Sequence, residues 1–165
     1  MPPTLKQVFT YRAFLVKDET APVGPIRGGA SRVVAPVTGG FITGSGVEAK
    51  VLSGGADWTL LDPATGTAHL DARVQARTSD GEHIYIRYPG IIKIDSTLEK
   101  AFAWDPQART TKSDDHYWIS TPIFEVSSEK LKWMEQSVFV AHGHIYAPGD
   151  GTQAVEYEVY KVVSA

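Results

Sequence analysis

The stretch HLDARVQARTSDGEHIYIRY, residues 69–88, contains two runs of alternating polar and apolar side chains with a turn between them. Ser79-Asp80-Gly81 suits a three-residue loop in which a type I turn is followed by glycine in the left-handed conformation. Such a loop pairs Thr78 with Glu82. The sequence therefore predicts an antiparallel β-hairpin of fixed register.

Alternation divides this hairpin into two faces. The polar face carries His69, Asp71, Arg73, Gln75, Arg77, His83, Tyr85 and Arg87. The apolar face carries Leu70, Ala72, Val74, Ala76, Ile84, Ile86 and Tyr88. Two arrangements fit this pattern. In the first, the polar face meets solvent, because buried charges are rare unless they are paired. In the second, the polar face lines the interior of a barrel, with Asp71 and Arg73 as an ion pair. Periodicity alone does not choose between them.

The rest of the chain also favours short strands separated by Gly and Pro turns. Further β-like runs cover residues 8–16, 32–37, 46–52, 117–126, 137–146 and 155–163, while the Pro- and Gly-rich residues 21–29 interrupt them. A short helix is predicted at residues 128–135 and one helical turn at 96–101. This organisation is typical of a sandwich or barrel, and we expect one all-β domain over residues 1–165, with less than about a fifth helix.

Composition excludes several classes of protein. The 165 residues include no cysteine, so no disulfide framework is possible, and 16 Lys and Arg against 19 Asp and Glu give a net charge of −3. The basic residues form no stripe that would bind nucleic acid. No apolar run approaches the ~20 residues of a membrane helix, and no signal-peptide pattern opens the chain. We therefore expect a cytoplasmic protein with neither nucleic acid nor membrane as a partner.

The sequence also lacks the motifs of most catalytic classes. The five histidines form no HExxH motif, so no metal site is expected. His142 and His144 are the one alternating pair, and a metal site with these two ligands on one strand face remains an alternative. No dinucleotide loop, catalytic cysteine or GxSxG motif is present, and no cofactor is expected. Acid and base chemistry by carboxyl, His and Tyr groups in a cavity remains.

Several short motifs together resemble one known family. They are GGF (39–41), SGGADW (53–58), LDAR (70–73), TSDG (78–81), IYIRYPG (84–90), PIFE (122–125) and LKW (131–133). The series is similar to a family of small bacterial and fungal proteins, long described only as a domain of unknown function, with a lipocalin-like up-and-down antiparallel β-barrel. The chain departs from the family pattern at Ile119, at WMEQ (133–136) and at His142 and His144, so a different ligand is expected.

The resemblance implies a barrel interior that contains family-characteristic side chains. It favours the second hairpin arrangement, and we predict that Asp71, Arg73 and Tyr85 point into the barrel. Resemblance to fungal biosynthetic members implies a cyclase or isomerase of secondary metabolism, which closes an ether ring on a prenylated aromatic polyketide. The alternative is a lipocalin-like carrier of a hydrophobic metabolite. The expected partner is a small aromatic or prenylated substrate, and a homo-oligomer is compatible with the sequence.

Candidate site residues follow from these expectations. The predicted catalytic residues are Asp57, Glu125, Arg73 and Tyr85. The predicted substrate-binding residues are Trp58, Asp71, Phe41, Tyr117, Trp133 and Glu135. Asp57 is the first choice for the acid, because it adjoins Trp58 in the GGADW motif. A purely structural role stays open for each: Asp57 as a brace of a turn, Trp58 as a core side chain, and Glu135 as an exposed helix residue.

Overall fold

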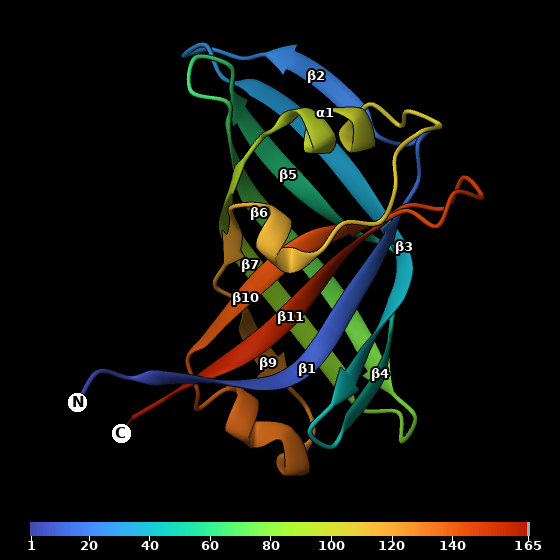
Figure 1. Ribbon diagram of the computed structural model, residues 1–165. Coiled ribbons are helices and arrows are strands. Elements are labelled where there is room, and N and C mark those ends of the chain that lie inside the picture. The colour runs from blue at the N-terminus through green and yellow to red at the C-terminus, as the bar shows by residue number, and fades with distance from the viewer. Residues whose placement is uncertain (165) are drawn as a thin grey trace.

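The computed structural model describes residues 1–164, whose eleven strands form one antiparallel sheet that closes on itself (Figure 1). Eight strands complete the ring, in the order β1-β3-β5-β6-β7-β8-β10-β11 and back to β1, and β2, β4 and β9 are added to it. The predicted up-and-down barrel is confirmed. The strands are β1 (Thr4–Leu15), β2 (Ala21–Pro25), β3 (Ser31–Gly44), β4 (Val47–Val51), β5 (Gly55–Asp62), β6 (Thr67–Thr78), β7 (His83–Lys93), β8 (Trp118–Ser120), β9 (Ile123–Val126), β10 (Phe139–Tyr146) and β11 (Ala154–Val163).

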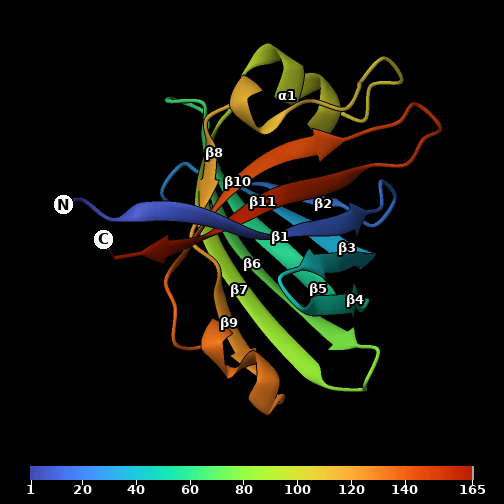
Figure 2. The same ribbon diagram turned by 60° about the horizontal axis from the view of Figure 1, so that its bottom comes forward.

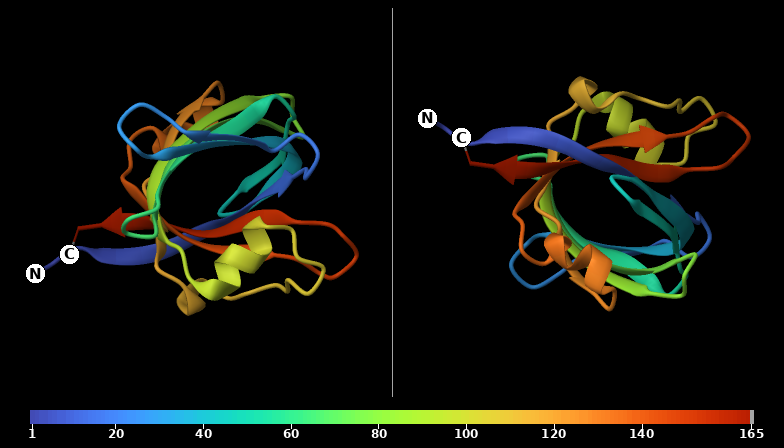
Figure 3. Two further views of the ribbon diagram at one scale, coloured as in Figure 1. Left: turned by 90° about the horizontal axis from the view of Figure 1, so that it is seen from above. Right: turned by 90° about the horizontal axis from the view of Figure 1, so that it is seen from below.

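The first and last strands close the barrel. β1 pairs with β11 from Thr4↔Val163 to Phe14↔Ala154, so the two ends of the chain lie side by side (Figure 3). The same pairing sets Tyr11 opposite Tyr157. Closure leaves few free strand edges, which is the usual solution for an antiparallel sheet with an apolar inner face.

The β6–β7 hairpin has the register that its loop predicts. Thr78 N donates to Glu82 O at 2.9 Å, and Gly81 has a φ of 87°, the left-handed conformation that glycine tolerates best. Arg73 pairs with Arg87 further along the ladder. Local turn chemistry was therefore sufficient to fix the alignment of β6 with β7, which pair without interruption from Thr67↔Lys93 to Arg77↔His83.

The predicted orientation of this hairpin is wrong. Asp71 and Arg73 lie on the outer surface with 40% and 43% of their side chains exposed, where they form an ion pair of 3.2 Å, and Tyr85 also lies on the outer face. The apolar face, including Leu70 and Tyr88, is buried inside the barrel. Burying the charges would have required a desolvation penalty of several kcal/mol for each ion, which the outer position avoids.

Short helices lie outside the strand ring, and helix makes up about 10% of the chain, as predicted (Figures 1 and 2). α1 (Ser96–Phe102) begins at the predicted place, where Asp95 accepts hydrogen bonds from Thr97 N and Leu98 N. The predicted helix at 128–135 is the 3-10 helix η2 (Glu129–Met134), and a second 3-10 turn is η1 (Ser113–Asp115). Within the described residues, no helix has the length and apolar character to cross a membrane.

β5 and β2 are the strands that sequence analysis did not anticipate. One alternative made Asp57 the brace of a turn, yet within the GGADW motif only Gly54, with a φ of 101°, takes a turn conformation, and β5 starts at the next residue. β2 forms in the Pro- and Gly-rich segment that was expected to interrupt the strands. This correction matters because β5 carries Asp57.

Candidate functional site

A cavity of about 370 Å³ lies inside the barrel. This is the size range of small-molecule sites. Most of its wall is apolar, and both β5 and α1 contribute to it. Its lining includes Leu15, Val33, Ala35, Val37, Leu61, Ala68, Leu70, Ile92, Ile94, Phe102, Trp104 and Val155. A molecule in this space is surrounded by the inner faces of the strands and by the C-terminal end of α1.

Tyr88, Tyr157 and Trp118 line one end of the cavity. Tyr11 does not line it but packs against Tyr88 and Tyr157, and we call these four aromatic side chains the aromatic floor. The Tyr11 and Tyr88 hydroxyl oxygens are 3.2 Å apart, and Trp118 Nε1 donates to the Tyr157 hydroxyl at 3.0 Å. Tyr11 and Tyr157 are stacked with centroids 5.8 Å apart, and Tyr88 meets Tyr157 edge to face at 5.4 Å. Burial raises the pKa of Tyr88 and of Tyr157 well above the ordinary range, so both hydroxyls stay protonated.

Gly143 allows Trp118 to take its place in the aromatic floor. A Cβ atom at this glycine would lie 2.6 Å from Trp118 Nε1, which is closer than side chains approach one another. Gly143 pairs with Tyr157 across β10 and β11, so the indole ring covers the glycine and reaches the Tyr157 hydroxyl. The absence of a side chain at this position thus sets one wall of the cavity.

Asp57 stands at an interruption of the β5–β6 ladder. Regular pairs run through Asp57↔Ala72 and resume at Leu60↔His69. In the gap, Asp71 N donates to Asp57 Oδ1 at 3.0 Å, and the Trp58 carbonyl oxygen accepts from the Arg32 guanidinium. Side chains therefore replace the missing backbone partners, which is necessary because buried backbone groups are rarely left unpaired.

The environment of Asp57 favours its protonated form. Burial raises the pKa of this carboxyl group to about 6, although hydrogen bonds from Asp71 N and from the Thr59 side chain and the positive charge of Arg32 act in the opposite direction. Asp57 lines the same cavity as Tyr88, Tyr157 and Trp118 of the aromatic floor. Among the described residues that line the cavity, Asp57 is the sole carboxyl group.

Asp57 is also the one predicted site residue that reaches the cavity in the described part of the chain. The neighbouring Trp58 points to the outer surface, where its ring lies 5.7 Å from the Arg73 guanidinium. Adjacent residues of a strand face opposite sides, so Asp57 and Trp58 cannot both face the ligand. The prediction of an acid and an aromatic wall side by side in this motif is wrong.

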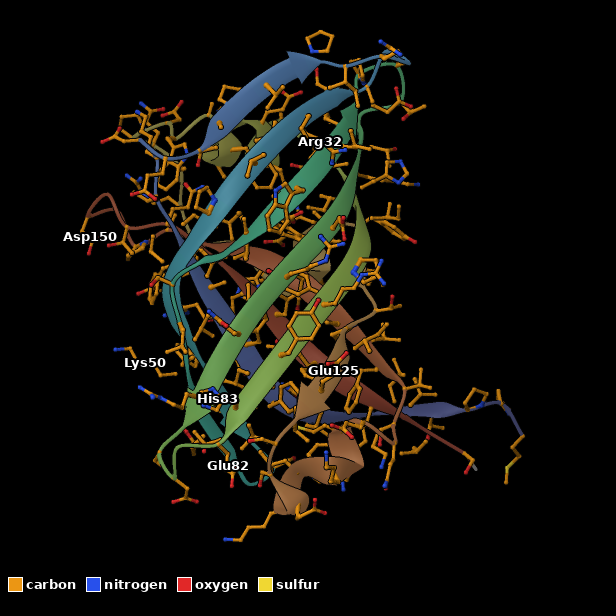
Figure 4. The ribbon with its side chains drawn as sticks, turned by 180° about the vertical axis from the view of Figure 1, so that it is seen from behind. Arg32, Lys50, Glu82, His83, Glu125 and Asp150 are labelled. Atoms are coloured by element: carbon orange, nitrogen blue, oxygen red, sulfur yellow. The ribbon has the colours of Figure 1, made fainter. Side chains whose placement is uncertain are left out.

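The other predicted catalytic residues lie outside the barrel. Arg73 pairs with Asp71 on the outer face, and Tyr85 lies opposite the exposed Glu125 across β7 and β9. Figure 4 views the molecule from this side and labels Glu125 on β9 beside His83 on β7. Tyr85 and Glu125 line an open surface depression there. Their position does not allow contact with a molecule in the cavity.

The remaining predicted binding residues are also outside the cavity. Phe41 lies 5.0 Å from the Arg12 guanidinium, and Tyr117 is 53% exposed beside Lys93. Trp133 packs against Phe139 at the opposite end of the core. Glu135 is exposed and accepts from Val126 N at 2.7 Å, so it anchors η2 to β9. All four have structural contacts that explain them.

Sequence analysis did not select the residues of the aromatic floor, although one signal for them was present. Tyr88 shares the apolar hairpin face with Leu70 and Ala72, so choosing that face as the interior would have identified it. Tyr11, Tyr157 and Trp118 come from three other strands, and their convergence depends on barrel closure.

The histidines form no metal centre. Within the described residues, no group of three His, Cys, Asp or Glu side chains is arranged to hold a metal ion. His144 Nε2 lies 3.4 Å from Glu156, and His142 Nε2 lies 3.2 Å from the His116 carbonyl oxygen. The two histidines therefore contact different protein groups and do not share one partner.

The fold and the cavity define a closed antiparallel β-barrel with an apolar, ligand-sized interior. Within this class, the chain belongs to the family described as "Protein of unknown function (DUF3237)", whose family model matches residues 3–162. A UPF0311 protein of Bradyrhizobium diazoefficiens is 33% identical over 147 residues, which cover 86% of this chain and 89% of that protein. One of Clostridium acetobutylicum is 34% identical over 113 residues, 66% of each chain. The resemblance to a barrel family of unknown function is thus confirmed.

Solved structures show the same fold. A conserved protein of unknown function from Rhodopseudomonas palustris has a TM-score of 0.84 at 26% identity, with 99% of both chains covered. A "beta-barrel like protein" from Acinetobacter baumannii has a TM-score of 0.74 at 27% identity, covering 98% of this chain and 97% of that one. An enzyme from Penicillium herquei has a TM-score of 0.61 at 20% identity, covering 98% and 96%, and this likeness extends to the fold alone.

Proposed function

We propose that this protein is a cofactor-independent cyclase or isomerase that closes an ether ring on a prenylated aromatic molecule, with Asp57 as the acid. The observation that carries the proposal is a single carboxyl group with a pKa raised to about 6 in an apolar cavity beside aromatic rings. With this pKa, roughly a tenth of the molecules hold the proton at pH 7, which suits a general acid at neutral pH.

The reaction needs only the proton of Asp57. The carboxyl group transfers it to the less substituted alkene carbon of the prenyl group, so that a C–H bond forms, the π bond breaks and a tertiary cation remains. The phenol oxygen of the substrate attacks this cation and forms the C–O bond. The phenolic proton passes to the Asp57 carboxylate, so the product is an isomer of the substrate and the acid is restored.

The aromatic floor supplies the remaining requirement, which is a wall that stabilises the cation. Trp118, Tyr88 and Tyr157 lie within one connected cluster beside the cavity. A cation over such a ring gains about 0.5 to 2 kcal/mol, more where water is excluded. A fixed pose between the floor and the apolar wall adds the advantage of orientation and favours one enantiomer.

The second candidate is a carrier that binds a hydrophobic metabolite unchanged. The bond from Asp71 N to Asp57 Oδ1 favours it, because Asp57 thereby completes the broken ladder and has a structural role that requires no chemistry. Asp57 Oδ1 accepts the hydrogen bond from Asp71 N, and in the proposed reaction the other carboxyl oxygen, Oδ2, carries the proton.

Turnover of a prenylated dihydroxybenzophenone, followed by chiral chromatography, tests the proposal. We expect one enantiomer from the wild type and a rate lower by ~10² to 10⁴ for Asp57→Asn, with binding retained. Glu125→Gln is the matched control, since it removes an exposed carboxylate outside the cavity, and it should leave the rate unchanged. A full rate and a single enantiomer from Asp57→Asn would exclude the acid role. Binding without turnover by the wild type would favour the carrier.

A further inference from the structure

The mouth of the cavity contains a buried amide with no partner. Gln153 is 4% exposed, and its Nε2 has no hydrogen-bond partner among the described residues. Its backbone carbonyl accepts from Leu15 N at 3.0 Å, so the residue is fixed at the junction of β1 and β11. A buried amide without a hydrogen-bond partner destabilises the folded state, and a ligand that accepts its hydrogen bond would remove this penalty.

Gln153 lies where two cavities meet. It lines the barrel cavity and also a second cavity of about 250 Å³. Two other residues, Lys17 and Trp104, belong to both linings. Lys17 is exposed, so this is the end at which the interior opens to solvent. The ammonium of Lys17 and the amide of Gln153 thus offer two donors at one place.

The spacing of residues along an extended chain gives the distance from Gln153 to Tyr157 of the aromatic floor. Gln153, Val155 and Tyr157 all line the cavity, as alternate residues of an extended chain do. Four residues of β-strand span roughly 13 Å at about 3.3 Å per residue. A ligand that reaches from Tyr157 to Gln153 is therefore longer than one aromatic ring with a prenyl group.

We propose that Gln153 and Lys17 bind an acceptor oxygen of the ligand, a ketone or an ionised acid, at the end opposite to the aromatic floor. The proposal rests on the proposed function for the occupant of the cavity, a prenylated aromatic molecule, and adds a carbonyl-type oxygen at its far end. Gln153 then selects the ligand and sets its depth, so that the apolar end meets Asp57 and the floor.

The test compares a prenylated dihydroxybenzophenone with its diphenylmethane analogue, in which CH₂ replaces the ketone. Binding is followed by quenching of tryptophan fluorescence in the Asp57→Asn background, where turnover does not interfere. We expect the ketone to bind roughly three- to tenfold more tightly, the ratio that one net hydrogen bond provides, and Gln153→Leu to abolish this preference. Gln107→Leu, a change at an exposed glutamine outside both linings, is the matched control and should retain it.

The two proposals fail in different ways. Gln153→Leu removes an unpaired buried donor, so its urea midpoint should equal or exceed that of the parent. This measurement distinguishes a loss of ligand preference from a loss of folding. Equal binding of ketone and analogue by the parent, or a preference that survives Gln153→Leu, overturns the inference. A ketone preference without turnover by the wild type supports the inference and overturns the cyclase. No binding of either compound overturns both.

Discussion

Replacing Asp57 by asparagine should stabilise the folded protein at neutral pH while it removes the acid. Burial raises the pKa of Asp57 from an ordinary 3.8 to about 6. Since each pKa unit corresponds to ~1.4 kcal/mol, the ionised carboxylate lowers the free energy of unfolding by about 3 kcal/mol above pH 6. Asparagine is uncharged, and its Oδ1 can still accept from Asp71 N.

The pH dependence gives the sign of the effect. Below pH 3.8 both the folded and the unfolded chain hold the proton, so Asp57 contributes no difference between wild type and variant. Between pH 3.8 and 6 the folded state keeps a proton that the unfolded state has released, and the stability of the wild type falls as pH rises. Above pH 6 the loss is complete. The advantage of Asp57→Asn should therefore grow from near zero at pH 4 to its full value at pH 8.

Urea denaturation of both proteins at several values between pH 4 and 8 measures this difference directly. A gain of ~3 kcal/mol corresponds to roughly 6 to 12 °C in Tm for a chain of this length. Asp62→Asn is the control, because Asp62 is exposed and hydrogen bonds from the Thr65 hydroxyl and Ala64 N lower its pKa. The control should show no gain at pH 8. A pH-independent difference for Asp57→Asn, or a less stable variant at pH 8, would refute the argument.

Other substitutions test the packing around the site. Gly143→Ala should displace the Trp118 ring and lower the free energy of unfolding by about 1 to 3 kcal/mol, measured by urea denaturation, with a changed near-ultraviolet circular dichroism spectrum; an unchanged spectrum would contradict the floor geometry. Arg73→Met should alter stability by at most about 1 kcal/mol and leave the ligand Kd unchanged, because its ion pair is exposed; a large change in Kd would place Arg73 at the site. Asp95→Ala should cost about 0.5 to 2 kcal/mol in thermal unfolding through loss of the α1 cap, and a neutral result would show that the cap is dispensable.

The fold was more predictable than the site because turns and alternation are local properties. The Ser79-Asp80-Gly81 loop fixed the hairpin register, and Gly and Pro turns marked the ends of most other strands, although β5 and β2 were not anticipated. Alternation defines two faces but does not say which one is inside. That choice depends on the desolvation of Asp71 and Arg73, which favours the outer face and outweighs the expectation from the family resemblance.

The site required long-range information. Tyr11 and Tyr157 are neighbours only because β1 pairs with β11, and no local pattern connects residues that distant. Asp57 lines the cavity, but the reason for choosing it, an aromatic wall formed by its neighbour Trp58, is wrong because Trp58 faces the opposite side. The relevant feature is the ladder gap that Asp71 N bridges, and it exists only once β5 and β6 are paired.

The pairing of β1 with β11 also has a consequence for synthesis in the cell. Thr4 meets Val163, so β1 waits for a partner strand, β11, that is synthesised about 150 residues later and completes the wall beside Tyr11. Until then the nascent chain exposes two unpaired strands and the aromatic residues of a half-built interior, a state prone to aggregation. Contacts between residues so distant in the sequence also form slowly, which prolongs this exposed state.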